Sequence, residues 1–152
     1  MTKRKFAVVS EYQNAGLRLP QRQTGASAGY DLAAAEDVLI APQKILAVPT
    51  GIKAYMKEDE VLLLYIRSGL ALKQGLCLAN GVGVIDADYA DNPDNEGHIR
   101  LAILNTSNQA VEIKKGTRIA QGIFFKYLLA DDDDFGGQKR GGGFGSTGAT
   151  LE

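Results

Sequence analysis

The sequence predicts an all-β domain, built as a sandwich or a barrel. Its apolar residues fall into short runs rich in Val, Ile and Leu, and Gly, Pro, Asn or Asp separates most of these runs. Short runs bounded by turn residues are typical of strands. Only residues 68–73 have the pattern of a helical turn, and this segment is brief. A sandwich or barrel is the architecture expected for many short strands with almost no helix.

The expected strands occupy much of residues 1–130. Pro42 and Pro49 bracket the strand at 44–48, and the polar segment at 105–109 resembles a hairpin connection into the strand at 110–113. In chain order, the strands are expected at residues 6–9, 38–41, 44–48, 51–56, 61–66, 76–78, 83–85, 99–106, 110–113 and 119–129.

The composition changes after Ala130. Four aspartates at 131–134 lead into a glycine-rich end, whereas the preceding 130 residues read as one domain that needs no disulfide or metal for stability. We therefore expect a β-barrel domain over residues 1–130. Residues 131–152 are expected to form an acidic hinge, extended by self-repulsion, and a flexible Gly-rich C-terminal arm.

Charge and cysteine content exclude several classes of protein. A formal net charge of -1 argues against direct binding of nucleic acid, so any nucleotide is expected in a pocket. Cys77, the only cysteine, lies between two leucines and is expected to be reduced and packed rather than nucleophilic. No segment resembles an export signal or a membrane span, so a cytoplasmic protein with no membrane partner is expected.

Two segments place chemistry-bearing residues at the ends of expected strands. Arg67 and Ser68 follow the strand at 61–66 and are suited to phosphate, although a plain turn explains the same residues. A turn-forming Asn-Gly leads into the strand at 83–85, and Asp86 follows it as a candidate general base. A strand capped by solvated acids explains Asp86 equally well. Along an unbroken strand, Asp86 and Asp88 would share one face.

Single residues elsewhere have both a functional and a structural interpretation. Asp31 is suited to holding a water on Mg²⁺, and equally to satisfying backbone amides in a turn. Gln121 can reach a phosphate, while Arg118 can serve as an ion-pair partner. His98 is the only histidine, which argues against a zinc site or a Ser-His-Asp triad.

The segment at 140–148 combines glycines with one arginine, one aromatic ring and two hydroxyls. Glycines let the backbone approach a ligand closely, a guanidinium suits phosphate, and a ring offers a face to a base. This composition indicates a flap that closes over a nucleotide. A disordered glycine-rich terminus is the simpler alternative.

Five segments in order resemble the five motifs of the homotrimeric deoxyuridine triphosphatase (dUTPase) family. The resemblance implies a jelly-roll-like β-barrel, assembled as a homotrimer with shared active sites at subunit interfaces. It also implies hydrolysis of dUTP to dUMP and pyrophosphate with Mg²⁺, which keeps uracil out of DNA and supplies dUMP for thymidylate synthesis. The matching segments are residues 28–32, 67–71, 83–89, 116–121 and 140–148.

The resemblance also implies residue roles. Asp86 would activate the water that attacks the α-phosphorus, and Asp31 would fix a water on Mg²⁺ chelated by the triphosphate. Tyr89 would lie against the deoxyribose and leave no room for a 2′-hydroxyl. Uracil would be read in a tight hairpin by Asn80 and by backbone around Gly83 and Ile85. The phosphates would be held by Arg67, Ser68, Gly69 and Gln121.

In the arm, the resemblance implies that Phe144 stacks over uracil and that Arg140, Ser146 and Thr147 grip the γ-phosphate, with Gly145 among the substrate-binding residues. Two features depart from the family pattern. Residues 90–95 intervene after Tyr89 as a loop insertion. One residue fewer separates Arg140 from Phe144, so either Arg140 would be displaced or Lys139 would share its role.

Two other functions compete with this interpretation. The related deoxycytidine triphosphate deaminases share the barrel, but no matching arginine-containing deaminase segment is present. A regulatory protein on the same barrel would use nucleotide binding as a switch, with residues 90–98 as its contact surface.

Overall fold

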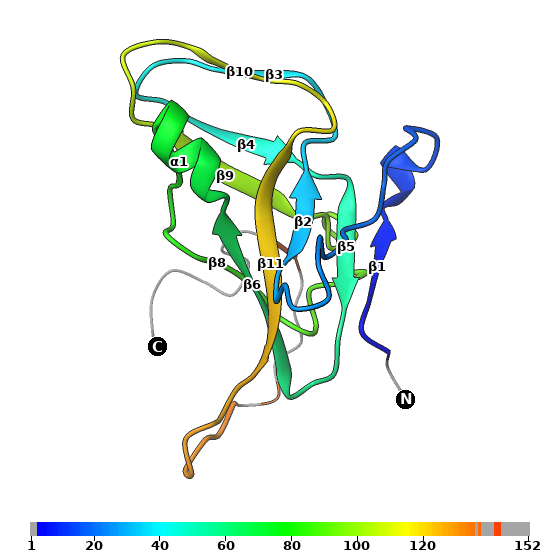
Figure 1. Cartoon of the computed structure of the whole chain (residues 1–152). Helices are drawn as coiled ribbons and strands as arrows, with labels where there is room; N and C mark the ends of the chain where they lie inside the picture. Colours follow the sequence, from blue (N-terminus) through cyan, green and yellow to red (C-terminus); the bar gives the residue numbers. More distant parts are fainter. Residues whose placement is uncertain (1–2, 136, 138–141, 144–152) are drawn as a thin grey trace.

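The computed structural model describes residues 3–135, 137, 142 and 143. Within them the chain is a jelly-roll-like β-barrel with one short α-helix (Figure 1), which confirms the predicted fold class. The helices are η1, a 3₁₀ turn at Ser10–Tyr12, and α1 at Ser68–Gln74. The strands are β1 Lys5–Val8, β2 Tyr30–Ala33, β3 Val38–Ile40, β4 Ile45–Pro49, β5 Ile52–Tyr55, β6 Glu60–Ile66, β7 Leu76–Leu78, β8 Gly83–Ile85, β9 Arg100–Asn105, β10 Val111–Ile113 and β11 Arg118–Lys126.

The described strands pair only in antiparallel ladders. A four-stranded sheet has the order β2-β11-β6-β8, and a three-stranded sheet has the order β4-β9-β7. Strand β1 pairs with β5, and β3 pairs with β10. Because neighbours in the sheets are mostly distant in sequence, closing the barrel brings together segments that local patterns cannot connect.

Alternating side chains of the strands form the core. In β6, Leu62 and Leu64 are buried, while Leu63 between them is partly exposed. Ile103 in β9 and Ile119 in β11 are also completely buried and belong to the same apolar cluster. This period of two is the pattern expected of strands with one face toward a core. A smaller cluster of Val9, Tyr12 and Ala35 packs η1 beside the barrel.

Two expected hairpins are wrong. Strand β9 pairs with β4 and β7, whereas β10 pairs with β3, so residues 105–109 join two sheets. Likewise β7 and β8 belong to different sheets, although Asn80 and Gly81 do form a tight turn in which the Gly81 N–H donates to Leu78 O at 3.0 Å. Both segments turn the chain sharply, which explains why each resembles a hairpin.

Other sequence expectations differ in detail. Strand β2 was not expected, because its residues have no sustained apolar alternation. Pro49 is the last residue of β4 rather than its outer boundary. Strand β11 ends at Lys126, and the chain then projects from the barrel through exposed Leu128, Leu129 and Phe135 (Figure 1). Among the described residues, no helix is long and apolar enough to cross a membrane.

Asn105 holds the turn that joins the two sheets. It is completely buried, and its Nδ2 donates to Ile40 O at 3.0 Å and to Gln109 O at 2.7 Å. Its Oδ1 accepts from the Ser107 N–H at 2.9 Å. One side chain therefore satisfies backbone groups on both sides of the connection.

We expect Asn105→Ala to lower the free energy of unfolding by about 2 kcal/mol or more, because it leaves several buried backbone groups unpaired. Urea unfolding at fixed protein concentration measures this change. Asn108→Ala is the matched control, since Asn108 is exposed in the same turn, and its effect should stay within about 0.5 kcal/mol. Equal effects of the two substitutions would contradict this role of Asn105.

Candidate active site

A carboxylate and two guanidiniums lie together at one end of β2. The Arg118 Nη1 lies 3.0 Å from Asp31 Oδ2, and the Arg67 Nε lies 3.7 Å from Asp31 Oδ1. The Asp31 side chain is only 12% exposed, whereas both arginines are about half-buried. The sequence interpretation of Arg118 as an ion-pair partner is confirmed. Two arginines thus flank one aspartate. The pairing of β2 with β11 determines where Asp31 and Arg118 lie.

Gln121 lies beside Asp31 because β11 pairs with β2 in that register. On its other side, Gln121 faces Tyr65 of β6. A Cβ added to Gly29 would lie 2.3 Å from Gln121 Oε1, so glycine there leaves room for the amide. Ser68 and Gly69 begin α1 and are exposed, and Gly69 has open space around it. These residues form the phosphate-side group, defined as Asp31, Arg67, Ser68, Gly69, Arg118 and Gln121.

A separate cavity of about 200 Å³ is lined by the predicted site residues between positions 80 and 89. The backbone is close-packed here, because a Cβ on Gly83 would lie only 3.0 Å from Leu64 Cβ. We call this the base-side cavity. It is lined by the predicted residues Asn80, Gly83, Ile85, Asp86 and Tyr89, and also by Leu64, Leu78, Val84, Arg100, Leu101 and Ala102.

Asp86 leaves β8 at the mouth of this cavity. Strand β8 ends at Ile85, and the Tyr89 N–H donates to Asp86 O at 3.1 Å, so the chain turns through residues 87 and 88. The alternation expected of an unbroken strand therefore stops at Asp86. The turn leaves Asp86 exposed but buries Tyr89, which is 7% exposed.

The inserted residues after Tyr89 form a compact loop with its own hydrogen bonds. Asn92 is buried; its Nδ2 donates to Tyr89 O at 2.7 Å, and its Oδ1 accepts from the Asn95 N–H at 3.1 Å. Asn95 Nδ2 donates to Tyr89 Oη at 2.8 Å, and the Tyr89 hydroxyl donates to His98 O at 3.1 Å. The loop therefore determines where the Tyr89 hydroxyl lies.

Gly97 closes this loop. Its φ is 80°, and a Cβ there would lie 2.6 Å from Ala90 Cα. Only glycine tolerates both the backbone conformation and the close approach. The two ends of the inserted loop therefore meet through a glycine.

Part of the C-terminal segment reaches the same loop of the same chain. The Gly143 N–H donates to Asp94 Oδ2 at 3.3 Å, and a Cβ on Gly143 would lie 2.7 Å from Asn95 Nδ2 and 3.1 Å from Tyr89 Oη. The predicted arm residues Arg140, Phe144, Gly145, Ser146 and Thr147 lie outside the described residues.

Two members of the phosphate-side group line a cavity apart from the base-side cavity. Asp31 and Arg118 line a cavity of about 570 Å³ that shares no lining residue with the base-side cavity. In the four-stranded sheet, β2 and β11, which carry Asp31, Arg118 and Gln121, lie on one side of β6, and β8 lies on the other.

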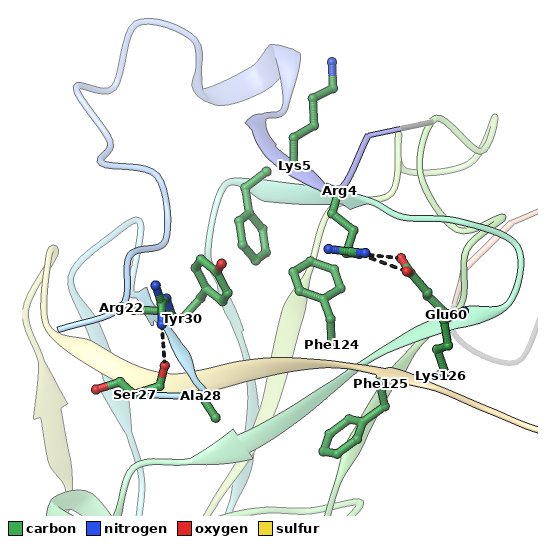
Figure 2. Close-up of a pocket in the computed structure, with 11 residues that line it drawn as sticks. Arg4, Lys5, Arg22, Ser27, Ala28, Tyr30, Glu60, Phe124, Phe125 and Lys126 are labelled. Atoms are coloured by element: carbon green, nitrogen blue, oxygen red, sulfur yellow. Dashed lines mark hydrogen bonds and ion pairs between the residues drawn. The ribbon is translucent and has the colours of Figure 1, made fainter. Parts of the chain in front are cut away.

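A third cavity, of about 550 Å³, holds none of the described residues that the sequence predicts for the site. The Phe6 ring packs against Tyr30 and Phe124 in its wall. Figure 2 shows the Tyr30 and Phe124 rings, and the Arg4 guanidinium paired with Glu60. Arg22 donates to two backbone carbonyls. Both arginines of this cavity therefore have partners within the protein, and its aromatic contacts are those of ordinary side-chain packing.

Sequence reasoning missed two charged residues near Tyr89. Arg100 lines the base-side cavity as the first residue of β9, but its register could not be inferred from the chain. Lys53 of β5 is 8% exposed, and its Nζ lies 2.5 Å from Asp91 Oδ1 and 2.7 Å from Glu96 Oε1. The only local signal was a lysine within an apolar strand.

Comparisons with known proteins agree with the order of the motifs. The family model described as dUTPase matches residues 16–148. A deoxyuridine 5′-triphosphate nucleotidohydrolase of Lactococcus lactis is 52% identical over 147 residues, covering 96% of this chain and 98% of the relative.

Solved structures agree as well. A dUTPase from Streptococcus mutans has a TM-score of 0.79 and 48% identity, covering 83% of this chain and 98% of that one. A mutant dUTPase of Staphylococcus aureus phage phi11, which coordinates a structural Mg(II) ion, has a TM-score of 0.72 at 23% identity. The match covers 87% of this chain and 95% of the phage chain, and at this identity it supports the fold alone.

We expect His98 to make stability depend on pH near neutrality. His98 is 5% exposed, its Nε2 accepts the Gly51 N–H at 2.9 Å, and burial together with nearby Arg100 lowers its pKa from 6.5. The pKa of His98 is 6.5 in the unfolded chain and lower in the folded chain. As the pH falls below 6.5, the unfolded chain therefore takes up a proton before the folded chain does. The stabilisation is therefore complete above about pH 6.5 and is lost as the pH falls through the folded pKa.

Urea unfolding between about pH 8 and pH 5 measures this loss. His98→Gln, which retains a hydrogen-bond acceptor but does not titrate, should show a shallower dependence. Identical pH dependence in the two proteins would contradict the assignment to His98.

Proposed function

Because the chain belongs to the dUTPase family, we infer that it hydrolyses dUTP to dUMP and pyrophosphate. The observation that carries this conclusion is the meeting of Asn80, Gly83, Asp86 and Tyr89 at one cavity, as expected for a base and sugar site beside a carboxylate. The reaction removes a source of uracil in DNA and supplies dUMP for thymidylate synthesis. Neither the deaminase nor the purely regulatory alternative gains support, since the matched relative is a nucleotidohydrolase.

We propose that Asp86 is the general base. Its carboxylate would accept a proton from the water that attacks the α-phosphorus. A bond forms between the water oxygen and phosphorus, and the bond to the oxygen bridging the α- and β-phosphates breaks, releasing pyrophosphate. The exposed position of Asp86 at the mouth of the cavity supports this role, because both water and phosphate can reach it.

Base and sugar selection are assigned to the remaining lining residues. Asn80 and the backbone at Gly83 and Ile85 would bind the uracil edge. The small volume and the tight Gly83–Leu64 packing support exclusion of a 5-methyl group. Tyr89 would lie against the deoxyribose and exclude a 2′-hydroxyl, and its buried, doubly hydrogen-bonded hydroxyl supports a fixed ring position.

The phosphate-side group would bind the triphosphate. Arg67, Ser68, Gly69 and Gln121 supply a cation, a hydroxyl and amides suited to phosphate oxygens. In the described part of the chain, no cluster of three or more His, Cys, Asp or Glu could hold a metal by itself. Asp31 would contribute through a water to Mg²⁺ that is held mainly by the substrate phosphates, the arrangement usual for this ion. When bound, the ion would neutralise phosphate charge.

The C-terminal arm is proposed to complete the site. In this proposal, residues 1–130 form the barrel domain, and 131–152 form the hinge and flap. Arg140, Ser146 and Thr147 would bind the γ-phosphate, Gly145 would approach the substrate, and Phe144 would stack over uracil. The contact of Gly143 with the loop beside Tyr89 supports an arm that reaches the base side.

We further propose a homotrimer with shared active sites. Asp31, Arg118 and Gln121 lie on strands at one edge of β6, and Asp86 follows β8 at its other edge, so a neighbouring subunit would bring the missing half.

We expect Asp86→Asn to lower kcat for dUTP by about 10²- to 10⁴-fold and to leave binding nearly intact, because the amide keeps the shape but cannot accept a proton. Pyrophosphate release measures turnover, and titration with a non-hydrolysable dUTP analogue measures binding. Asp88→Asn is the matched control, since Asp88 is exposed in the same turn, and it should remain near the parent. Turnover of Asp86→Asn within a few-fold of the parent would exclude Asp86 as the base.

Mixing variants tests the shared sites. Arg67→Ala subunits retain an intact base side, and Asp86→Asn subunits retain an intact phosphate side. Co-expressed together, they should regain activity well above either variant alone, because some sites then combine the two intact halves. Light scattering of the parent should give a trimer mass. A monomer mass, or mixed trimers without regained activity, would contradict the shared-site arrangement.

A further inference from the structure

We propose that Lys53 is a positioning residue for sugar selection: through Asp91 and Glu96 it holds the loop at residues 90–97, which contains the insertion at 90–95, and thereby fixes Tyr89 at the base-side cavity. The inference deepens the proposed function and rests on it, because it uses Tyr89 as the residue that excludes a 2′-hydroxyl. It assigns a specific task to the loop insertion.

The Tyr89 hydroxyl depends on the loop for its partners. It accepts from Asn95 Nδ2 at 2.8 Å and donates to His98 O at 3.1 Å. Asn95 is itself held inside the loop, since its Oδ1 accepts from the Gly97 N–H at 3.0 Å and from Asn92 Nδ2 at 2.8 Å. A shift of the loop therefore moves the groups that hold the ring.

The loop backbone does not favour its own conformation. Asp91 and Glu96 have φ values of 60° and 61°, in the left-handed region that residues other than glycine adopt at a cost. A backbone bond joins the same two residues, with the Asp91 N–H donating to Glu96 O at 3.1 Å. Hydrogen bonds within the loop oppose this strain, and contacts from outside the loop add to them.

Those contacts meet at Lys53. Its Nζ lies 2.5 Å from Asp91 Oδ1 and 2.7 Å from Glu96 Oε1, so one ammonium bridges both strained residues. Burial disfavours the charged ammonium, but the hydrogen bonds that it donates to the carboxylates of Asp91 and Glu96 outweigh burial and raise the pKa of Lys53. The lysine thus remains charged, and β5 provides it with a rigid attachment.

Two neighbouring residues also hydrogen-bond to the carboxylates of Asp91 and Glu96, but each of them reaches only one carboxylate. The Tyr55 hydroxyl donates to Asp91, and the Ser10 N–H and Oγ donate to Glu96. Neither neighbour links Asp91 with Glu96. Loss of the ammonium leaves two like charges side by side at the loop closure, where they repel each other.

The test compares kcat/KM for dUTP and UTP in full-length parent and variants. We expect Lys53→Met to lower the dUTP/UTP ratio by about 10-fold, because a small displacement of a positioning contact is costly. Lys53→Arg, which keeps the charge, should restore much of the ratio. Lys114→Met is the matched control: Lys114 also pairs with two carboxylates, Asp37 and Glu112, but lies on the β10 side of the barrel, so the ratio should be unchanged.

Further variants separate positioning from simple destabilisation. Tyr89→Ala should lower the ratio by itself, and adding Lys53→Met should then change it little, because the lysine acts through the ring. Glu96→Gln weakens the same bridge from the loop and should shift the ratio in the same direction if Lys53→Met does not fold. An equal fall of kcat/KM for both nucleotides, with an unchanged ratio, would overturn the proposal. So would an unchanged ratio in Tyr89→Ala. A parent that does not hydrolyse dUTP would instead refute the proposed function.

Discussion

The placement of strand β11 between β2 and β6 is the constraint on which both the barrel and the site depend. Its pairing with β2 sets Gln121 beside Asp31, and its pairing with β6 sets Gln121 beside Tyr65. The same strand buries Ala120 and Gly122, while Gln121 between them is only partly buried, so a shift of one residue would turn the buried set outward. Burial therefore fixes the register, and the register fixes the phosphate-side group.

Buried polar groups provide a second level of order. In the described part of the chain, every buried side-chain nitrogen or oxygen has a hydrogen-bond partner. Asn105 joins the two sheets, Asn92 organises the inserted loop, and Lys53 attaches that loop to β5. Leaving any one of these groups unpaired costs more than its bond contributes, so each specifies a particular chain path.

The sequence predicted what local patterns encode. The strands at 76–78 and 83–85 have the expected bounds, because their apolar residues are flanked by turn residues. The motifs located Asp86 and Tyr89, and the base-side cavity brings them together. Pairing was not predictable, since two turns that resemble hairpins join different sheets. Lys53 was missed because its partners are 38 and 43 residues away in the chain.

The two charge clusters of the candidate site are mirror images of each other. In the phosphate-side group, two partly exposed arginines pair with one largely buried carboxylate, Asp31. In the loop bridge, two more exposed carboxylates pair with one largely buried ammonium, Lys53. Each buried charge needs its partners, because an unpaired buried charge carries a large desolvation penalty. Accessible cations therefore lie where a triphosphate is expected, and a buried cation lies where a ring must stay in place.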